Sequence, residues 1–399
     1  MKDKKQKYAD LLLKCLKLED KKYLFVRLPD FLSDFADLIK ISAESYDLKE
    51  VHIEVEEVFK KHDLLRDLDQ ENINKHPMFD HKEYNRYAKL DAAFLFIQSM
   101  VPNLMDDVDP KKIKDTATHT RETEREFRSL YETDKLNWCI AGVPNKYWAQ
   151  DGLKMSEDEL WELIFKVCLV DDEHDPYLLW QEKLNALEEK AEVLNDYNFE
   201  YLKYSNSLGT DLKVYLPKGH IWACGKDKLG RIVNLPTEEI FTSPLYNKTE
   251  GIVYSSKPLL YNNVSIEDFY LEFKEGKIVN FHAEKGEEVL KGIIETDEYS
   301  CYLGECALVS FDSPISNTNI IFQETLYDEN ASCHLAIGSG FNECLKDSFD
   351  KRGDELRALG VNDAKTHVDF MIGTKDLRIV GVTYDGEEIT IMQEGNIAI

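Results

Sequence analysis

Acidic and imidazole side chains recur in the C-terminal half of the chain, each in or beside a short segment with strand or turn character. Hard and borderline divalent cations accept both ligand types, and a mixed carboxylate and imidazole set suits Zn, Co, Mn or Mg. A pair of ions needs several carboxylates to offset its charge, with imidazoles completing the two shells. We therefore predict a hydrolase with two divalent metal ions, held by Glu239, Glu305, Glu329, His334, His367 and Asp369.

The spacing of these residues indicates how they are presented. His367 and Asp369 are two positions apart, so on a strand they share one face. Glu329 and His334 are separated too irregularly for one face of a strand or helix, which predicts a turn near Asn330. Taken singly, each residue has a simpler interpretation as a surface carboxylate or a buried structural histidine. All six have apolar neighbours, however, and unpaired charges are rarely left in such surroundings because desolvation is costly.

The segments that contain these residues resemble a known family. They are N-L-P-T-E-E-I-F-T (234–242), L-G-E-C-A-L-V (303–309), E-N-A-S-C-H-L-A-I-G (329–338) and T-H-V-D-F-M-I-G (366–373), together with G-T-D-L-K-V (209–214). In this order they are similar to the thermophilic metalloaminopeptidase family of the aminopeptidase T and aminopeptidase S type. The resemblance implies a cytoplasmic, homodimeric exopeptidase with two metal ions that removes residues from peptides with a free N-terminus. It places metal ligands at the six positions named above.

One departure from the family pattern concerns the residue seven positions after the histidine of the H-x-A-x-G segment. The family commonly has tyrosine there, and this chain has Phe341. A phenyl ring can neither ligate a metal nor donate a hydrogen bond to an intermediate. Tyr327 or Tyr384 could supply a substitute hydroxyl. Two alternatives stay open. A catalytically weakened relative that serves as a binding or scaffold protein would explain Phe341, and a dinuclear-metal hydrolase of another amide would use the same metal chemistry.

Hydrolysis at such a centre needs a group that takes a proton from the attacking water and passes it to the leaving amine. Glu305 is one candidate, as a bridging ligand that also acts as the base. Glu238 is the other, because it adjoins the ligand Glu239. If that segment is a strand, Glu238 faces the opposite side, and a solvent-facing partner of the ligand strand is the simpler interpretation.

Composition narrows the class of protein further. The formal charge of -27 argues against nucleic acid and anionic membranes as partners, since both reward a basic surface. The eight cysteines form no C-x-x-C pair, and a chain of 399 residues needs no disulfides to fold, so we expect reduced cysteines. No secretory signal or membrane span is recognisable, which favours the cytoplasm.

The first half alternates helix and strand signals, which is typical of an α/β fold with a mainly parallel sheet. No G-x-G-x-x-G or Walker sequence follows its strands, so nucleotide binding is not expected. After residue 200, short strands separated by turn residues predict a β-rich domain. We therefore expect an N-terminal α/β domain (1–195) and a β-rich, barrel-like catalytic domain (196–399). The expected helices are 6–18, 32–45, 120–131, 157–169 and the connector 185–195; the expected strands include 23–28, 51–55, 92–97, 136–142, 213–217, 251–254, 277–282, 377–384 and 388–391.

Overall fold

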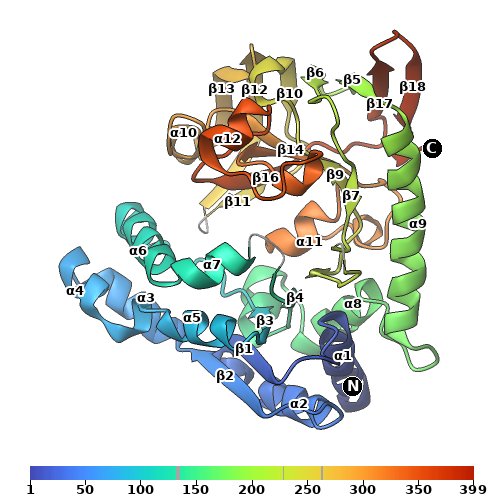
Figure 1. The fold of residues 1–399 in the computed structure, drawn as a ribbon. Coiled ribbons are helices and arrows are strands. Elements are labelled where there is room, and N and C mark those ends of the chain that lie inside the picture. Colours follow the sequence, from blue (N-terminus) through green and yellow to red (C-terminus); the bar gives the residue numbers. More distant parts are fainter. Residues whose placement is uncertain (132–134, 228, 262–263) are drawn as a thin grey trace. The chain divides into compact units, whose positions relative to one another are not determined.

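The computed structural model describes residues 1–131, 135–227, 229–261 and 264–399 (Figure 1). They form two compact units, and each unit draws on two separate stretches of chain. The first unit comprises Met1–Gln181 with Lys226–Pro236, and the second comprises Glu182–Gly225 with Thr237–Ile399. The single boundary expected at residue 195 is thus replaced by three crossings, after Gln181, Gly225 and Pro236.

The first unit is built on a five-stranded sheet in the order β2-β1-β3-β4-β8, and all of its strand pairs are parallel. This confirms the predicted parallel α/β architecture. The strands are β1 (Tyr23–Pro29), β2 (Glu50–Glu56), β3 (Ala93–Gln98), β4 (Trp138–Gly142) and β8 (Asn234–Leu235). The helices are α1 (Lys2–Cys15), α2 (Ser33–Ala43), α3 (Val58–Asp67), α4 (Gln70–Lys75), α5 (Lys82–Lys89), α6 (Pro110–Thr123), α7 (Arg125–Tyr131) and α8 (Glu157–Val167).

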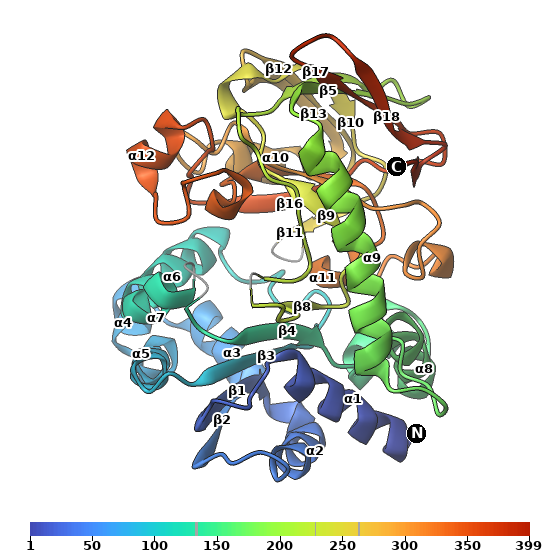
Figure 2. The same cartoon turned by 45° about the vertical axis from the view of Figure 1, so that its right-hand side comes forward.

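Side chains that alternate along these strands cover the two faces of the sheet. Phe25, Phe94 and Phe96 lie on one face and pack with aromatic residues of α5 and α7. Leu24 and Val26 are fully buried on the other face, where α1 and α2 lie (Figure 2). Helices on both faces explain why these strands read as nearly continuous apolar runs.

The local signals at helix ends were informative in one place and incomplete in another. Ser156 caps α8 as predicted, and a reciprocal capping box joins it to Glu159. The expected helix 120–131 is instead shared between α6 and α7, because Glu124 between them has non-helical angles.

The inserted stretch Lys226–Pro236 belongs to the first unit through both its strand and a buried arginine. β8 pairs with β4, and Arg231 is 1 % exposed. Its guanidinium forms an ion pair with Asp227 and donates to the Leu136 carbonyl at 2.8 Å and to Asn137 Oδ1 at 2.6 Å. Arg231 is therefore committed to the fold of this unit.

The second unit confirms the predicted β-rich part, with its strands distributed between two antiparallel sheets. One follows the order β11-β12-β10-β6-β5-β17-β18-β19, with β13 paired to β12, and the other follows β16-β15-β14-β9-β7. The strands are β5 (Phe199–Ser205), β6 (Asp211–Tyr215), β7 (Ala223–Cys224), β9 (Ile240–Thr242), β10 (Glu250–Tyr254), β11 (Leu259–Tyr261), β12 (Val264–Lys274), β13 (Lys277–Lys285), β14 (Leu303–Leu308), β15 (His334–Gly338), β16 (His367–Met371), β17 (Arg378–Thr383), β18 (Glu388–Gln393) and β19 (Asn396–Ile397).

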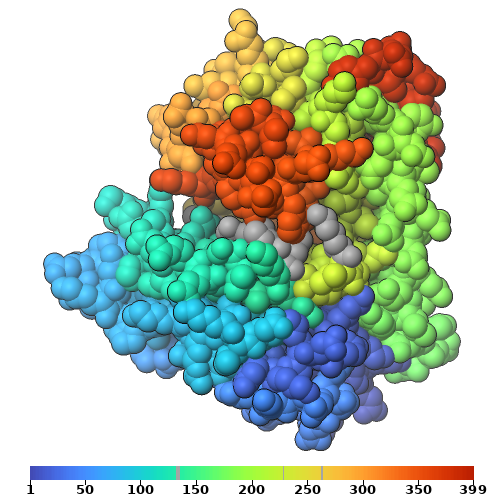
Figure 3. Space-filling view, viewed as in Figure 1, coloured from blue at the N-terminus to red at the C-terminus, as the bar shows by residue number. Residues whose placement is uncertain are grey.

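The helices of this part are few. α9 (Pro176–Asp196) contains the first crossing and the predicted connector, and α10 (Glu287–Ile294), α11 (Thr325–Glu329) and α12 (Gly353–Ala358) follow. α10 contributes Leu290 and Ile293 to the core of the unit, whereas α12 lies at the surface, where its orange-red residues face the viewer in Figure 3. Within the described ranges, no helix has the length and apolarity needed to cross a membrane.

Candidate metal centre

The five-stranded sheet of the second unit presents the predicted ligands on one of its faces. Its register aligns Glu305 of β14 with Ala336 of β15, and Ala336 with Asp369 of β16. Directly opposed residues of an antiparallel sheet point to the same face, so the two carboxylates flank a methyl group. A small side chain between them leaves space at the surface of the sheet for a ligand.

A second row of this face carries His334. His334 is opposed to Ala307, which is itself opposed to Phe241 of β9. Glu239 immediately precedes β9, two positions before Phe241. The alternate residues of the same strands, such as Leu335 and Phe370, point to the opposite face and enter the hydrophobic core. Because these alternate residues must be buried in the core, the side chains between them point to the face that carries the site.

A glycine sets the position of Glu305. The pairing of β14 with β15 shifts between Leu303 and Glu305, where Gly304 lies. A Cβ on Gly304 would lie 2.0 Å from the Ser339 carbonyl oxygen, a distance that no side chain permits. The close approach of these two segments therefore requires glycine directly before Glu305.

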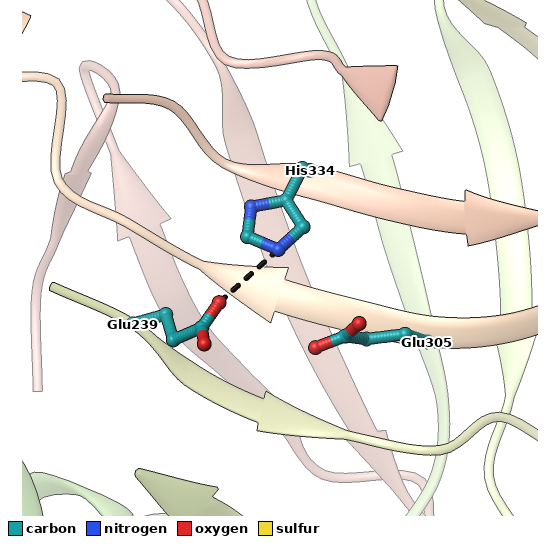
Figure 4. A group of neighbouring side chains, drawn as sticks. All are labelled: Glu239, Glu305 and His334. Carbon is teal, nitrogen blue, oxygen red and sulfur yellow. Dashed lines mark ion pairs between the residues drawn. The ribbon is translucent and has the colours of Figure 1, made fainter. Parts of the chain in front are cut away.

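Among the described residues, two groups have ligand atoms that all lie within 4.8 Å of one another. The first is Glu239, Glu305 and His334, with His334 Nε2 at 3.2 Å from a Glu239 carboxylate oxygen (Figure 4). The second is Glu305, His367 and Asp369, with His367 Nε2 at 3.2 Å from an oxygen of each carboxylate. Glu305 belongs to both groups.

The two imidazoles are oriented by backbone carbonyls. His334 Nδ1 lies 3.0 Å from the Ser332 carbonyl oxygen, and His367 Nδ1 lies 2.7 Å from that of Ser339. A carbonyl only accepts, so each Nδ1 donates and each Nε2 is directed at the carboxylates. Metal-binding histidines commonly have this arrangement, because the outer hydrogen bond fixes the tautomer and ring orientation.

Burial places the carboxylates under strong mutual repulsion. Burial, together with the charges of Asp369 and Glu239, raises the pKa of Glu305 to about 7 against an opposing hydrogen bond from His367. Burial also acts to raise the pKa of Asp369. The charges of His367 and His334 outweigh it and lower that pKa to about 2. Asp369 Oδ1 is fully buried, and His367 Nε2 lies 3.2 Å from it as its ion-pair partner. The donor set therefore fits divalent cations, which would compensate the excess negative charge.

Glu329, the sixth predicted ligand, lies at the end of α11 and outside both groups. Burial first, and then the charges of Asp369 and Glu239, raise its pKa well above the usual value. Asn330 links Glu329 to the loop that carries Glu239, because its Nδ2 lies 3.4 Å from Glu329 Oε1 and its Oδ1 accepts from the Glu238 N–H. The separation of Glu329 from His334 by a turn at Asn330 agrees with the sequence prediction.

Glu238 occupies a position that the sequence did not predict. The residues before β9 are not in a strand, and Glu238 is only 7 % exposed, so the expected solvent-facing orientation is wrong. Its carboxylate forms an ion pair with Lys183 of α9. Burial raises the pKa of Glu238, and Lys183 opposes that rise.

Phe341 lies beside the centre, whereas one of the two proposed substitutes does not. The ring centroid of Phe341 is 5.0 Å from that of His367 and 5.2 Å from that of Phe241. Tyr384 is 48 % exposed, and the charge that acts on its pKa, after burial, is that of Glu200. Tyr327 is fully buried and stacks on Phe322 at 5.0 Å.

Three residues of the site were missed by the sequence prediction: Lys183, Asn330 and Ala336. Lys183 lies far from Glu238 in the sequence, and no local pattern links them. Asn330 was noted only as a turn, and its buried side chain accepts a hydrogen bond from the Glu238 N–H at 2.7 Å. Ala336 lies between Glu305 and Asp369 through the register of three strands, and the sequence carries no local signal for that register.

Comparisons with known proteins show which family this chain resembles along its whole length. The sequence model of the family described as thermophilic metalloprotease (M29) matches residues 1–397. Aminopeptidase AmpS of Bacillus subtilis is 38 % identical, covering 98 % of this chain and 97 % of that relative. Aminopeptidase T of Thermus thermophilus is 35 % identical, covering 82 % and 81 %. The solved structure of wild-type AmpT from Thermus thermophilus has a TM-score of 0.89 and 31 % identity, covering 100 % of both chains.

Proposed function

The chain belongs to the thermophilic metalloprotease (M29) family, and from this membership we propose that it is a metal-dependent aminopeptidase. Its substrates are peptides with a free N-terminus, from which it removes the first residue. The names of its relatives, aminopeptidase AmpS, aminopeptidase 2 and aminopeptidase T, support this assignment.

The observation that carries the proposal is the sharing of Glu305 between two ligand groups. One group adds Glu239 and His334, and the other adds His367 and Asp369. A carboxylate common to two groups is the arrangement that a pair of ions requires of a bridging ligand. We therefore assign two divalent ions to the site, which the members of the two groups, with Glu305 common to both, would hold.

Glu329 completes the proposed ligand set, because its carboxyl group lies beside the same carboxylates and would offer further oxygen ligands. When bound, the two ions supply an activated water and a Lewis acid for the scissile carbonyl. The chain itself supplies the orientation of both imidazoles through the Ser332 and Ser339 carbonyls. Zn, Co, Mn and Mg all accept this mixture of ligands.

We assign the transfer of one proton, from the attacking water to the leaving amine, to a carboxylate of the site. Glu305 is the first candidate because it belongs to both groups. Glu238 is the second, since it adjoins Glu239; burial raises its pKa, and the ion pair with Lys183 opposes that rise. Substitution of each by glutamine separates these roles.

The proposal is tested with chelator-stripped protein and a panel of aminoacyl-p-nitroanilides and short peptides. Each substrate is measured before and after the addition of Zn, Co, Mn or Mg, with an N-acetylated peptide as the control. We expect metal-dependent release from free N-termini only. Binding of two ions without any release would refute the aminopeptidase assignment and favour a catalytically weakened relative or a hydrolase of another amide.

We further propose that the enzyme is a cytoplasmic homodimer. The resemblance of its motifs to the metalloaminopeptidase family supports both statements. Size-exclusion chromatography with light scattering measures the mass of the particle, and a value near 46.3 kDa would identify a monomer and contradict the dimer. Cell fractionation tests the compartment.

A further inference from the structure

The side chain of Asn330 is fully buried and connects two separate segments of the candidate site. Its Oδ1 accepts a hydrogen bond from the Glu238 N–H at 2.7 Å. Its Nδ2 donates to the Leu326 carbonyl at 2.9 Å, and the same Nδ2 lies 3.4 Å from Glu329 Oε1. Asn330 is 0 % exposed, so water cannot replace these contacts.

The first segment is the loop before β9, which carries Glu239. The Glu238 N–H belongs to the peptide that precedes Glu238, so its hydrogen bond to Asn330 fixes the backbone one residue before a proposed ligand. A ligand loop held at its backbone has fewer orientations to lose when a cation binds.

The second segment is the end of α11, which carries Glu329. Asn330 follows this helix directly and returns its amide to the carbonyl of Leu326, four residues earlier. The same amide group approaches the Glu329 carboxylate itself. A donor at that oxygen orients the Glu329 carboxyl group, as outer hydrogen bonds to metal ligands commonly do.

We propose that Asn330 is a positioning residue, whose single amide sets the separation of Glu239 and Glu329 and thereby the affinity of the site for its ions. The inference rests on the proposed metal-dependent function. It requires both halves of the amide, since an acceptor is needed for the Glu238 N–H and a donor for Glu329. Asn330 is not a catalytic residue, because it acts through Glu239 and Glu329.

The test compares Asn330→Ala and Asn330→Ser with a matched control, Asn145→Ala. A serine hydroxyl can still donate to the carbonyl four residues earlier, so Asn330→Ser retains the contact with Leu326 and loses the bridge to Glu238. Asn145 is also a buried amide: its Oδ1 accepts from the Trp148 N–H, and its Nδ2 donates to the Met100 carbonyl. It belongs to the first unit and touches no proposed ligand.

The full-length, chelator-stripped proteins are titrated with Mn²⁺ and with Zn²⁺ against a fluorescent chelator, and the number of ions and their Kd are measured. Outer hydrogen bonds to metal ligands are typically worth 10-fold to 100-fold in affinity. We expect a loss of about that size for Asn330→Ala and Asn330→Ser and no more than about twofold for Asn145→Ala. Excess metal should restore activity to the Asn330 variants, and the measured Kd, rather than this rescue, separates weakened ion binding from a packing defect.

Three outcomes decide the matter. Weakened ion binding in both Asn330 variants, with a Tm of Asn330→Ser close to that of the wild type, supports the positioning role. Unchanged ion number and Kd in both variants, with only a lower Tm, overturns it while the proposed function stands. Failure of the wild-type protein to bind any ion overturns the proposed function and this inference together.

Discussion

Replacement of Glu305 by glutamine should change the stability of the protein in opposite directions with and without metal. Burial, with Asp369 and Glu239, raises the pKa of Glu305 to about 7, whereas the ordinary value is 4.5. The folded state therefore holds the proton more tightly than the unfolded state. The cost of the ionised form is absent below pH 4.5 and is complete above about pH 7. At pH 8 it amounts to about 3 kcal/mol.

Glu305→Gln removes this cost, although the loss of the ion pair with His367 offsets part of the gain. We expect the metal-free variant to be more stable than the metal-free wild type by up to about 3 kcal/mol at pH 8, and by less than about 1 kcal/mol at pH 5. With ions present the order should reverse, because the variant lacks the ligand common to both groups. The value of kcat/KM should fall by at least about 10³-fold, which corresponds to about 4 kcal/mol.

The assay is denaturant unfolding of wild type and Glu305→Gln at both pH values, in chelator and in saturating Mn²⁺. The two-ion interpretation of Glu305 predicts a crossover between the metal-free and metal-loaded series. Equal destabilisation of the variant in all four conditions would refute the reasoning, since that result identifies Glu305 as an ordinary structural carboxylate.

Three further substitutions address the centre. Ala336→Leu fills the space between Glu305 and Asp369 without altering a ligand, and it should abolish binding of at least one ion in a metal titration. Ala141→Leu in β4 is the matched overpacking control. Equal ion binding by both variants would contradict a metal site between Glu305 and Asp369. Phe341→Tyr adds a hydroxyl beside His367 and should raise kcat about 10-fold, the worth of one hydrogen bond in a transition state, so an unchanged kcat would show that no phenol is used. Glu238→Gln should lower kcat about 100-fold at unchanged ion content if it carries the proton, and a loss under about threefold would leave Glu305 as the base.

Much of the site was predictable because its chemistry is local. His367 and Asp369 share a face because a strand alternates, and that rule needs only two positions of sequence. The turn at Asn330 follows from a spacing that suits neither helix nor strand. The ligand types alone indicated hard or borderline cations.

The rest depended on contacts between distant residues. The row of Glu305, Ala336 and Asp369 is a matter of strand register, which is set by core packing across three strands. Glu238 was interpreted as exposed because its burial depends on Lys183 in α9, a helix distant in sequence. These features follow from tertiary structure and have no local signature.

The domain boundary at residue 195 differed from the compact units for a similar reason. Among its described residues, the stretch Lys226–Pro236 contains only two in a strand, which is too short for a periodic signal. Its membership of the first unit is decided by the pairing of β8 with β4 and by the buried Arg231. β4 and the acceptors of Arg231 on Leu136 and Asn137 are all distant from this stretch in the sequence.

This interleaving limits how the protein can be dissected. A fragment that ends at residue 195 keeps β4 but loses β8, so the β4 backbone becomes an open sheet edge. Such an edge is a template for pairing with other chains, and the fragment should aggregate when expressed. The same cut removes Arg231 from its acceptors on Leu136 and Asn137. Soluble halves would have to be made by closing the chain across the excursion, with 226–236 fused to the first fragment.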